Sequence, residues 1–217
     1  MPELGDRPML LRRRGSDARV LWDTIHGRYH LPPGDLASAD ARLIIDLGSN
    51  IGLTMAHLAT RFTRARVLGV EPDPGSASLA RNNIEPWRDR CELVEAAIWP
   101  TDGAVNLATR EGSEWAAHVG PAAGATVEAI SLDSLLAQTA PDRVDYMKVD
   151  IEGAERDVLR AGGDWPRRVE RLKVEVHPPY TVTECAEDLQ AIGYEPTIDE
   201  RHWACVVGRR TQASAAR

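Results

Sequence analysis

The amino-acid sequence predicts an α/β fold in which helices cover a mostly parallel sheet that ends in an antiparallel hairpin. Between residues 41 and 193, five apolar strand-like runs alternate with segments of helical spacing. This order is typical of parallel strands connected by helices. Two further strand-like runs follow, joined by a short charged turn at 199–201, which indicates a hairpin. A chain of 217 residues with 43% hydrophobic residues fits one well-cored domain.

Each element follows from its local pattern. The expected strands are 42–46, 66–71, 91–97, 144–150, 171–177, 193–198 and 202–207. The expected helices are 54–62, 74–84, 154–161 and 182–192. Met55, Leu58 and Phe62 have the spacing of one helical face. Pro74 suits a first helical turn, and Gly162 suits a helix end.

The chain divides into three parts. Residues 1–40 are predicted to be an N-terminal extension or cap, because they end in a turn signal rich in proline and glycine. Residues 41–208 hold the predicted α/β domain, and 209–217 read as a flexible tail of small and polar residues. Within the domain, 101–127 has weak periodicity and predicts an irregular insertion with one or two short strands.

Composition excludes several classes of protein. The formal net charge of −7 argues against a nucleic-acid partner, and the basic run at 12–14 is expected to be a solvated strand or turn. No apolar run approaches the roughly 18 residues that a membrane span needs. Three scattered cysteines and no apolar leader favour a reducing compartment, so a cytoplasmic location is expected. The cysteines are Cys91, Cys185 and Cys205.

A glycine-containing loop follows the first strand, with the sequence Asp46-Leu47-Gly48-Ser49-Asn50-Ile51-Gly52. Ligands of open α/β sheets bind beyond the carboxyl ends of the strands, which is where this loop lies. The helix after it offers free N–H groups and partial positive charge to a carboxylate. Glu71 ends the next strand, where a carboxylate can accept both ribose hydroxyls of a nucleoside cofactor, and Pro72 then turns the chain.

Two nucleoside cofactors fit this pattern. A dinucleotide site has the fingerprint Gly-x-Gly-x-x-Gly, but Asn50 replaces the middle glycine that pyrophosphate requires. Asp46 would also face phosphate charge unfavourably, whereas it suits the amino group and sulfonium of S-adenosylmethionine. The loop therefore favours S-adenosylmethionine, with an NAD-dependent dehydrogenase as the rival hypothesis.

Candidate reaction residues end two later strands. Strand alternation places Lys148 and Asp150 on one face, and Asp150 at the edge beside the expected methyl donor. His177 could act as a general base, since its ordinary pKa lies near neutral pH. Asp150, Glu175 and His177 could also converge on a divalent metal, which is possible but not expected to be required.

These motifs together resemble the FkbM family of methyltransferases, within the class I Rossmann-like group. The matching segments appear in family order over about residues 43–177. They are Ile45 to Gly52, Val70-Glu71-Pro72, Arg81-Asn82-Asn83, Glu95-Ala96-Ala97, Leu132-Asp133, Lys148 to Glu155 and Val174 to His177. Ser49 stands where the family usually has alanine, and 1–40 and 101–127 match nothing in it. A substrate lid would lie in those two stretches.

The resemblance implies a seven-stranded sheet with an antiparallel last strand and helices on both faces. It implies that Gly48 and Gly52 shape the cofactor loop and that Glu71 takes the ribose. It further implies that Glu95 and Ala96 flank the adenine, while Asp150 lies near the reaction centre.

The implied reaction is O-methylation of a hydroxyl on a sugar or a secondary metabolite, with S-adenosylmethionine as cosubstrate. The protein would align the reactants for in-line transfer, and His177 or Asp150 would take the hydroxyl proton. Lys148 would orient the acceptor oxygen or keep Asp150 ionised. The expected partner is a small hydroxylated acceptor, and a homodimer stays possible. N-methylation, or a non-catalytic scaffold with the same fold, are the alternatives.

Overall fold

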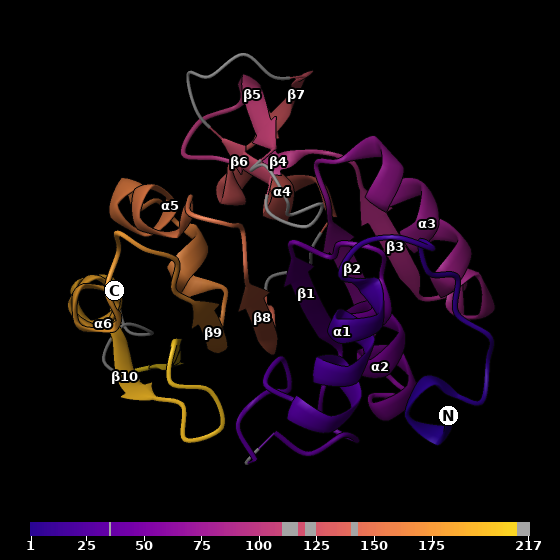
Figure 1. The fold of residues 1–217 in the computed structure, drawn as a ribbon. Coiled ribbons are helices and arrows are strands. Elements are labelled where there is room, and N and C mark those ends of the chain that lie inside the picture. Colours follow the sequence, from indigo (N-terminus) through magenta and orange to yellow (C-terminus); the bar gives the residue numbers. More distant parts are fainter. Residues whose placement is uncertain (35, 110–116, 120–124, 140–142, 212–217) are drawn as a thin grey trace.

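The computed structural model describes every residue except 35, 110–116, 120–124, 140–142 and 212–217 (Figure 1). Its centre is a seven-stranded sheet in the spatial order β10-β11-β9-β8-β1-β2-β3. Its strands are β1 (Leu43–Leu47), β2 (Arg66–Val70), β3 (Cys91–Val94), β8 (Tyr146–Val149), β9 (Arg171–Glu175), β10 (Tyr194–Ile198) and β11 (Cys205–Arg210). Strands β3, β2, β1, β8 and β9 are parallel, and β11 is antiparallel to both β9 and β10. The predicted seven-stranded sheet with its antiparallel hairpin is confirmed.

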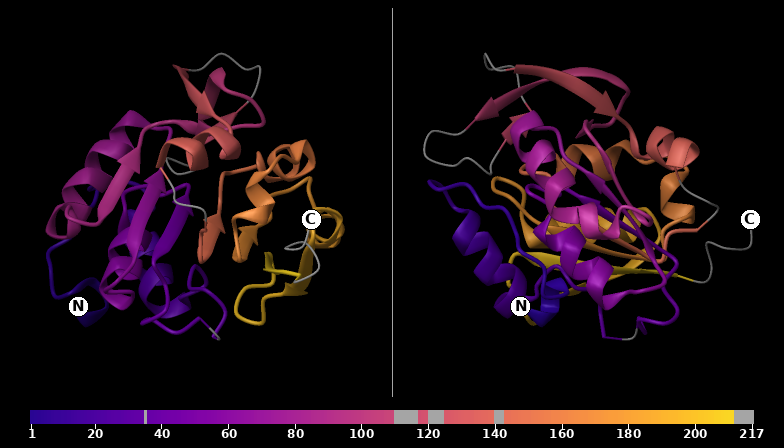
Figure 2. Two further views of the ribbon diagram at one scale, coloured as in Figure 1. Left: turned by 180° about the vertical axis from the view of Figure 1, so that it is seen from behind. Right: turned by 90° about the vertical axis from the view of Figure 1, so that its right-hand side faces the viewer.

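Helices cover both faces of this sheet, as the two views of Figure 2 show. They are α1 (Asp17–Trp22), α2 (Leu53–Arg61), α3 (Pro74–Ile84), α4 (Leu132–Thr139), α5 (Glu155–Ala161) and α6 (Val182–Ala191). Successive side chains of a strand point to opposite faces, so β1 serves two cores. Ile44 packs with Met55 of α2, while its neighbour Ile45 packs in a cluster with Leu136 of α4 and Leu159 of α5.

Capping groups fix the ends of the helices around the sheet. Helix α3 has the predicted bounds because the Asp73 carboxylate accepts from the Ser76 amide at 2.6 Å. Helix α6 begins with a capping box in which Thr181 and Glu184 bond each other's backbone amides. Helix α2 begins after Gly52, whose φ of 80° turns the chain out of the preceding loop.

The prediction that 101–127 is an irregular insertion with one or two short strands was wrong, because three strands lie wholly or partly in this range. A second sheet, ordered β4-β7-β5-β6, contains β4 (Ala97–Ile98), β5 (Gly103–Thr109), β6 (Ala117–Val119) and β7 (Ala125–Ile130). It stands apart from the main sheet at the top of Figure 1. Its strands are rich in small and polar residues, and most described positions of β5 and β7 are exposed or half-buried, so their apolar alternation is faint. The expected single strand 91–97 is likewise split between β3 and β4.

The N-terminal segment packs across helix α2. It contains the short turns η1 (Pro2–Leu4) and η2 (Asp23–Gly27) on either side of α1, and Leu4 and Ile25 pack against Ala56. Two further short turns, η3 (Glu85–Trp87) and η4 (Trp165–Arg167), follow α3 and α5. The N-terminal segment therefore packs directly against helix α2 of the α/β domain.

At the other end of the chain, β11 continues past the predicted domain boundary at residue 208. Arg209 pairs with Glu195, and Arg210 pairs with Tyr194. Residues 212–217 of the predicted tail lie outside the described residues. Among the residues that the structure describes, no helix combines the length and hydropathy needed to cross a lipid bilayer.

Candidate active site

The loop after β1 is locked against the ends of two neighbouring strands. The amides of Gly48 and Ser49 both donate to the carbonyl of Val70, at 2.9 and 3.0 Å. Gly48 has φ of 77°, and a Cβ here would lie 1.7 Å from the carbonyl oxygen of Asp150. Glycine is therefore required at position 48 both by the backbone conformation and by the closeness of β8.

Glu71 holds the same loop from the end of β2. Its carboxylate accepts from the amides of Asn50 at 2.8 Å and Asp73 at 2.9 Å. The side chain is buried, and burial raises the pKa of Glu71 to about 7, against the effect of these two hydrogen bonds. A carboxylate has about four acceptor sites, so two remain for a ligand after the two amides are bound.

Lys148 links the loop to the end of β8. Its ammonium lies 2.9 Å from Asp150 Oδ2 and 3.4 Å from Asp46 Oδ1, and it donates to the carbonyl of Gly48 at 3.4 Å. Burial alone would lower the pKa of Lys148, but the carboxylates of Asp150 and Asp46 raise it well above its ordinary value. The ammonium is therefore permanently charged, and it lies directly beside Asp150.

His177 lies behind Asp150 and is held by carboxylates. Its Nδ1 is 2.9 Å from Glu155 Oε1, and its Nε2 is 3.4 Å from Glu152 and 3.8 Å from Asp150. Burial lowers the pKa of His177, but the hydrogen bond and charge of Glu155 outweigh it and raise the pKa to about 9. Glu155 is fully buried and also accepts from the amides of Ile151 and Gly153. At neutral pH the imidazole is thus protonated.

Two more carboxyl groups face the same centre. Burial and, to a smaller extent, the charge of Asp150 raise the pKa of Glu152 to about 7 and that of Glu175 to about 8. Oε2 of Glu175 is buried without a hydrogen-bond partner among the described residues. These two groups hold protons close to neutral pH, as expected for groups that exchange them during a reaction.

The structure also brings together the three predicted metal ligands. One atom each from Asp150, Glu175 and His177 lies within 4.8 Å of the others. The Glu155 bond on Nδ1 would leave Nε2 for a metal, an arrangement common in metal sites. Lys148, however, already supplies Asp150 with a cation at 2.9 Å, so the carboxylate does not require a metal for charge balance.

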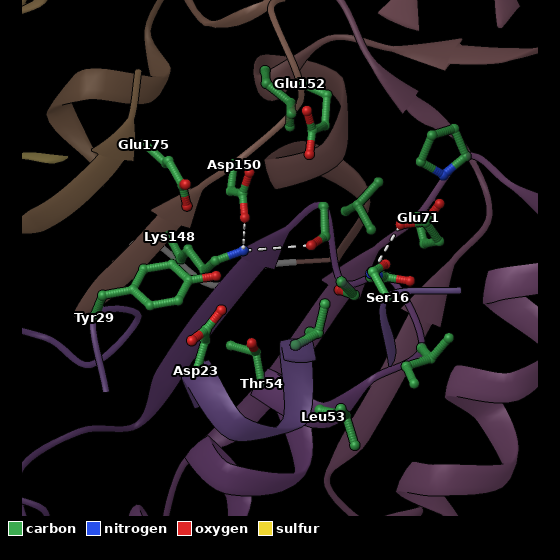
Figure 3. A pocket seen from close by; sticks show the side chains of 18 of the residues that line it. Ser16, Asp23, Tyr29, Leu53, Thr54, Glu71, Lys148, Asp150, Glu152 and Glu175 are labelled. Atoms are coloured by element: carbon green, nitrogen blue, oxygen red, sulfur yellow. Dashed lines mark hydrogen bonds and ion pairs between the residues drawn. The ribbon is translucent and has the colours of Figure 1, made fainter. Parts of the chain in front are cut away.

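These groups surround a cavity of about 470 Å³ (Figure 3), within the size range of pockets for drug-sized ligands. At one end the cavity is lined by the loop and the ends of β2 and β4, through Gly48, Ser49, Asn50, Glu71, Pro72, Ala96 and Ile98. At the other end it is lined by Lys148, Asp150, Glu152 and Glu175. Except for Ile98, the first set consists of residues predicted to bind a cofactor. The second contains Lys148 and Asp150, predicted to support a reaction, Glu175, predicted as a possible metal ligand, and Glu152, which was not predicted.

Four of the predicted site residues are not among the described residues that line the cavity. Asp46 is fully buried behind Lys148. Gly52 lies against Ala80, where a Cβ would come within 3.0 Å of that residue's Cα. Glu95 is exposed and pairs with Arg81 at 2.8 Å. His177, the fourth, lies behind the Asp150 side chain, with its Nε2 3.8 Å from Oδ1 of that carboxylate.

A third group of lining residues was not predicted residue by residue. Arg19, Asp23 and Tyr29 come from the N-terminal segment, and Arg201 and His202 from the turn between β10 and β11. The stretch 1–40, where a substrate lid was expected, thus contributes residues to the cavity wall, whereas no described residue of 101–127 lines the cavity. For the hairpin turn, the available signal was its position at the same sheet edge as the ends of β8 and β9.

Arg12 is likewise not the solvated residue that the sequence predicted. Its guanidinium pairs with the fully buried Asp17 at 2.6 Å and donates to Asn50 Oδ1 at 3.3 Å and to Ser76 Oγ at 3.4 Å. The N-terminal segment is thereby fastened to the glycine-containing loop and to the start of α3.

Solved structures with this architecture include methyltransferases. The precorrin-6y C5,15-methyltransferase of Geobacter metallireducens GS-15 aligns over 95% of this chain and 96% of its own, with a TM-score of 0.55 and 13% identity. The fibrillarin pre-rRNA processing protein of Methanococcus jannaschii aligns over 95% and 84%, with a TM-score of 0.56 and 11% identity. At such identities the likeness shows the fold alone, which is that of class I methyltransferases. Residues 46–195 match the methyltransferase FkbM domain, and the chain belongs to the FkbM family.

Three named relatives are identical to this chain at a quarter or more of the aligned positions. The 2-O-methyltransferase NoeI of Sinorhizobium fredii is 28% identical over 55% of this chain and 57% of its own length. The hexuronic acid methyltransferase AglP of Haloferax volcanii is 26% identical over 76% and 69%. The methyltransferase sdnD of Sordaria araneosa is 25% identical over 74% and 76%. The chain therefore spans little more than half of the first of these relatives.

Proposed function

We propose that this protein is an S-adenosylmethionine-dependent O-methyltransferase acting on a hydroxyl of a small molecule, such as a sugar or a secondary metabolite. The observation that carries the proposal is the cavity itself, which joins Glu71 and the glycine-containing loop to the Lys148–Asp150 pair. Family membership supports the methyl donor, and the relatives include a 2-O-methyltransferase and a hexuronic acid methyltransferase.

The donor end of the cavity has groups for each part of a nucleoside ligand. The two remaining acceptor sites of Glu71 suit a pair of ribose hydroxyls, and Pro72, Ala96 and Ile98 offer an apolar slot for a base. The amides of Gly48, Ser49 and Asn50 are already bonded within the protein. The carboxylate of the bound donor would therefore lie at the first turn of α2. The amides of this turn have no partner inside the helix, and its residues Leu53 and Thr54 line the cavity.

The reaction end supports transfer to oxygen. The donor supplies a methyl group already activated by sulfonium charge, so the protein must align the acceptor and remove its proton. Asp150 lies at the cavity with Lys148 beside it, and Glu152 and Glu175 stand next to it as further carboxyl groups. An attacking hydroxyl must lose a proton, and this group of carboxylates provides the acceptor. We assign His177 to positioning Asp150 and Glu152, since it is cationic at neutral pH.

Calorimetric titration with S-adenosylmethionine, S-adenosylhomocysteine and NADH tests the donor. We expect micromolar binding of the first two and none of NADH. Glu71→Gln should weaken binding by about 10- to 100-fold, since hydrogen bonds to a charged group contribute about 1.5–3 kcal/mol. Glu92→Gln, at an exposed carboxylate of β3 that does not line the cavity, is the matched control and should bind as the wild type does.

A folded protein that binds neither S-adenosyl compound would contradict the proposal and favour the scaffold hypothesis. For the chemistry, transfer of labelled methyl to hydroxylated acceptors should fall by orders of magnitude in Asp150→Asn. The same transfer should be unchanged by EDTA. Loss of activity with EDTA, restored by Mg²⁺, would instead assign Asp150, Glu175 and His177 to a metal.

A further inference from the structure

The outer wall of the cavity contains a row of aromatic rings. Tyr29, from the N-terminal segment, and His202, from the β10–β11 turn, both line the cavity. Their ring centroids are 5.2 Å apart with an interplanar angle of 35°. Trp203 continues the row, its ring 6.4 Å from that of His202 and tilted from it by 12°, and its side chain is 81% exposed. We refer to Tyr29, His202 and Trp203 as the aromatic wall.

The inner end of the aromatic wall reaches the reaction centre. In Figure 3 the Tyr29 side chain points its hydroxyl toward Lys148 and Asp150. The charges of Asp150, Lys148 and Glu175 all act on this phenol, and burial, the largest effect, raises the pKa of Tyr29 far above its ordinary value. The hydroxyl has no hydrogen-bond partner among the described residues. It is therefore a neutral O–H group available to a ligand beside the proposed proton acceptor.

One buried cation fixes both segments that carry the wall. The Lys173 ammonium donates to the carbonyls of Tyr29 at 2.6 Å and Leu31 at 2.8 Å, and it pairs with Asp199 Oδ2 at 2.7 Å. Asp199 in turn accepts from the Arg201 amide at 3.1 Å through Oδ1. The Lys173 side chain is buried in the middle of β9, so the two segments are held at a fixed separation.

We propose that the aromatic wall is the acceptor-binding surface, and that it takes a hydroxylated ring, a pyranose, by its flat apolar face. Aromatic side chains combine a large apolar face with a polar edge, which matches a pyranose with C–H groups on its faces and hydroxyls around its rim. The Tyr29 hydroxyl binds a rim hydroxyl and holds the reacting oxygen near Asp150. Trp203, further out, packs against a second ring in a longer acceptor. This inference rests on the proposed methyl transfer.

The test uses methyl pyranosides as acceptors and D-glucitol as the open-chain control, with labelled S-adenosylmethionine. We expect the pyranosides to accept methyl groups and D-glucitol to fail. Tyr29→Leu should raise the acceptor KM by about tenfold, because it removes the aromatic face on which the acceptor ring packs. Tyr29→Phe, which keeps the ring, should lower kcat with a smaller effect on KM.

Trp22→Leu is the matched control, because Trp22 is also exposed at 63% but stacks on His26 outside the cavity lining. Its KM and kcat should equal those of the wild type. S-adenosylhomocysteine binding, measured for every variant, shows that the protein is folded and that its donor site is intact, independently of the acceptor site. Intact donor binding with no transfer to pyranosides, or with an unchanged KM in Tyr29→Leu, would overturn the aromatic wall. Absent donor binding in the wild type would instead overturn the proposed function.

Discussion

Lys148 is the residue on which most of the site's geometry depends. The register of the sheet places Asp46 of β1 directly opposite Lys148 of β8, so the ammonium lies between a fully buried carboxylate and Asp150 in the cavity. Removing one partner of a buried ion pair leaves the other charge uncompensated in a medium of low polarity.

We therefore expect Lys148→Met to lower the free energy of unfolding by about 3–5 kcal/mol. The double variant Lys148→Met, Asp46→Leu should recover part of this loss, because it removes the stranded carboxylate as well. Urea denaturation of the four proteins of this double-mutant cycle measures the coupling. Additive losses would mean that the two charges do not interact.

Individual site residues were predictable where chain order alone decides their place. Glu71 and Asp150 follow β2 and β8, the two parallel strands on either side of β1, and the carboxyl ends of these strands share one edge of the sheet. The prediction that Asp46 faces the ligand depended on the register between β1 and β8, two strands a hundred positions apart. Sequence periodicity does not contain that register. Glu95 and Ala96 are adjacent in sequence, yet only the alanine lines the cavity.

Among the elements, the strands of the main sheet were predicted because burial on both faces produces long apolar runs. Helices α2, α3, α5 and α6 were also predicted, whereas α4, which packs into the same core, was not. The second sheet was not, since its strands carry small and polar residues. The N-terminal segment was expected to hold a substrate lid, but its pattern did not indicate which of its residues line the cavity. Its attachment depends on Lys173, a charged residue between Leu172 and Val174 in the middle of β9, whose partners lie far away in the sequence.

Lys173→Met should release both segments of the cavity wall. Tyr29 and Leu31 would each lose a donor to their carbonyls, and Asp199 would lose its counter-ion. We expect limited trypsin digestion to become several-fold faster after Arg28 and Arg201, which are exposed next to the freed segments. Cleavage after Arg64, exposed between α2 and β2, is the internal control. Equal rates at all three sites would show that Lys173 does not hold the wall.

At the scale of the whole molecule, titratable side chains in and next to the cavity keep protons that they would lose in the unfolded chain. Glu71, Glu152 and Glu175 have raised pKa values of about 7, 7 and 8, and His177 has one of about 9. In the unfolded chain, these carboxyl groups and the imidazole are deprotonated above about pH 6.5. The folded protein therefore binds more protons than the unfolded chain between pH 6.5 and 9.

Stability must then fall as pH rises through this range, because proton release favours the unfolded chain. We expect the melting temperature of the ligand-free protein, measured with EDTA present, to decrease steadily from pH 6.5 to pH 9. Glu175→Gln should show a shallower decrease, since one of the four groups no longer titrates. A melting temperature that rises over this range would contradict the assigned pKa directions.

At residues 29–31, the N-terminal segment is attached to the sheet through its main chain. Lys173 and the Tyr146 hydroxyl bind the carbonyl oxygens of Tyr29, His30 and Leu31, and every amino acid carries that oxygen. A different residue at position 29 would meet the same anchors and keep the same path. The contacts that hold this segment in place are thus independent of the side chain that position 29 presents to the cavity. Position 29 is a natural site for randomisation, at which acceptor preference could be exchanged while the fold is preserved.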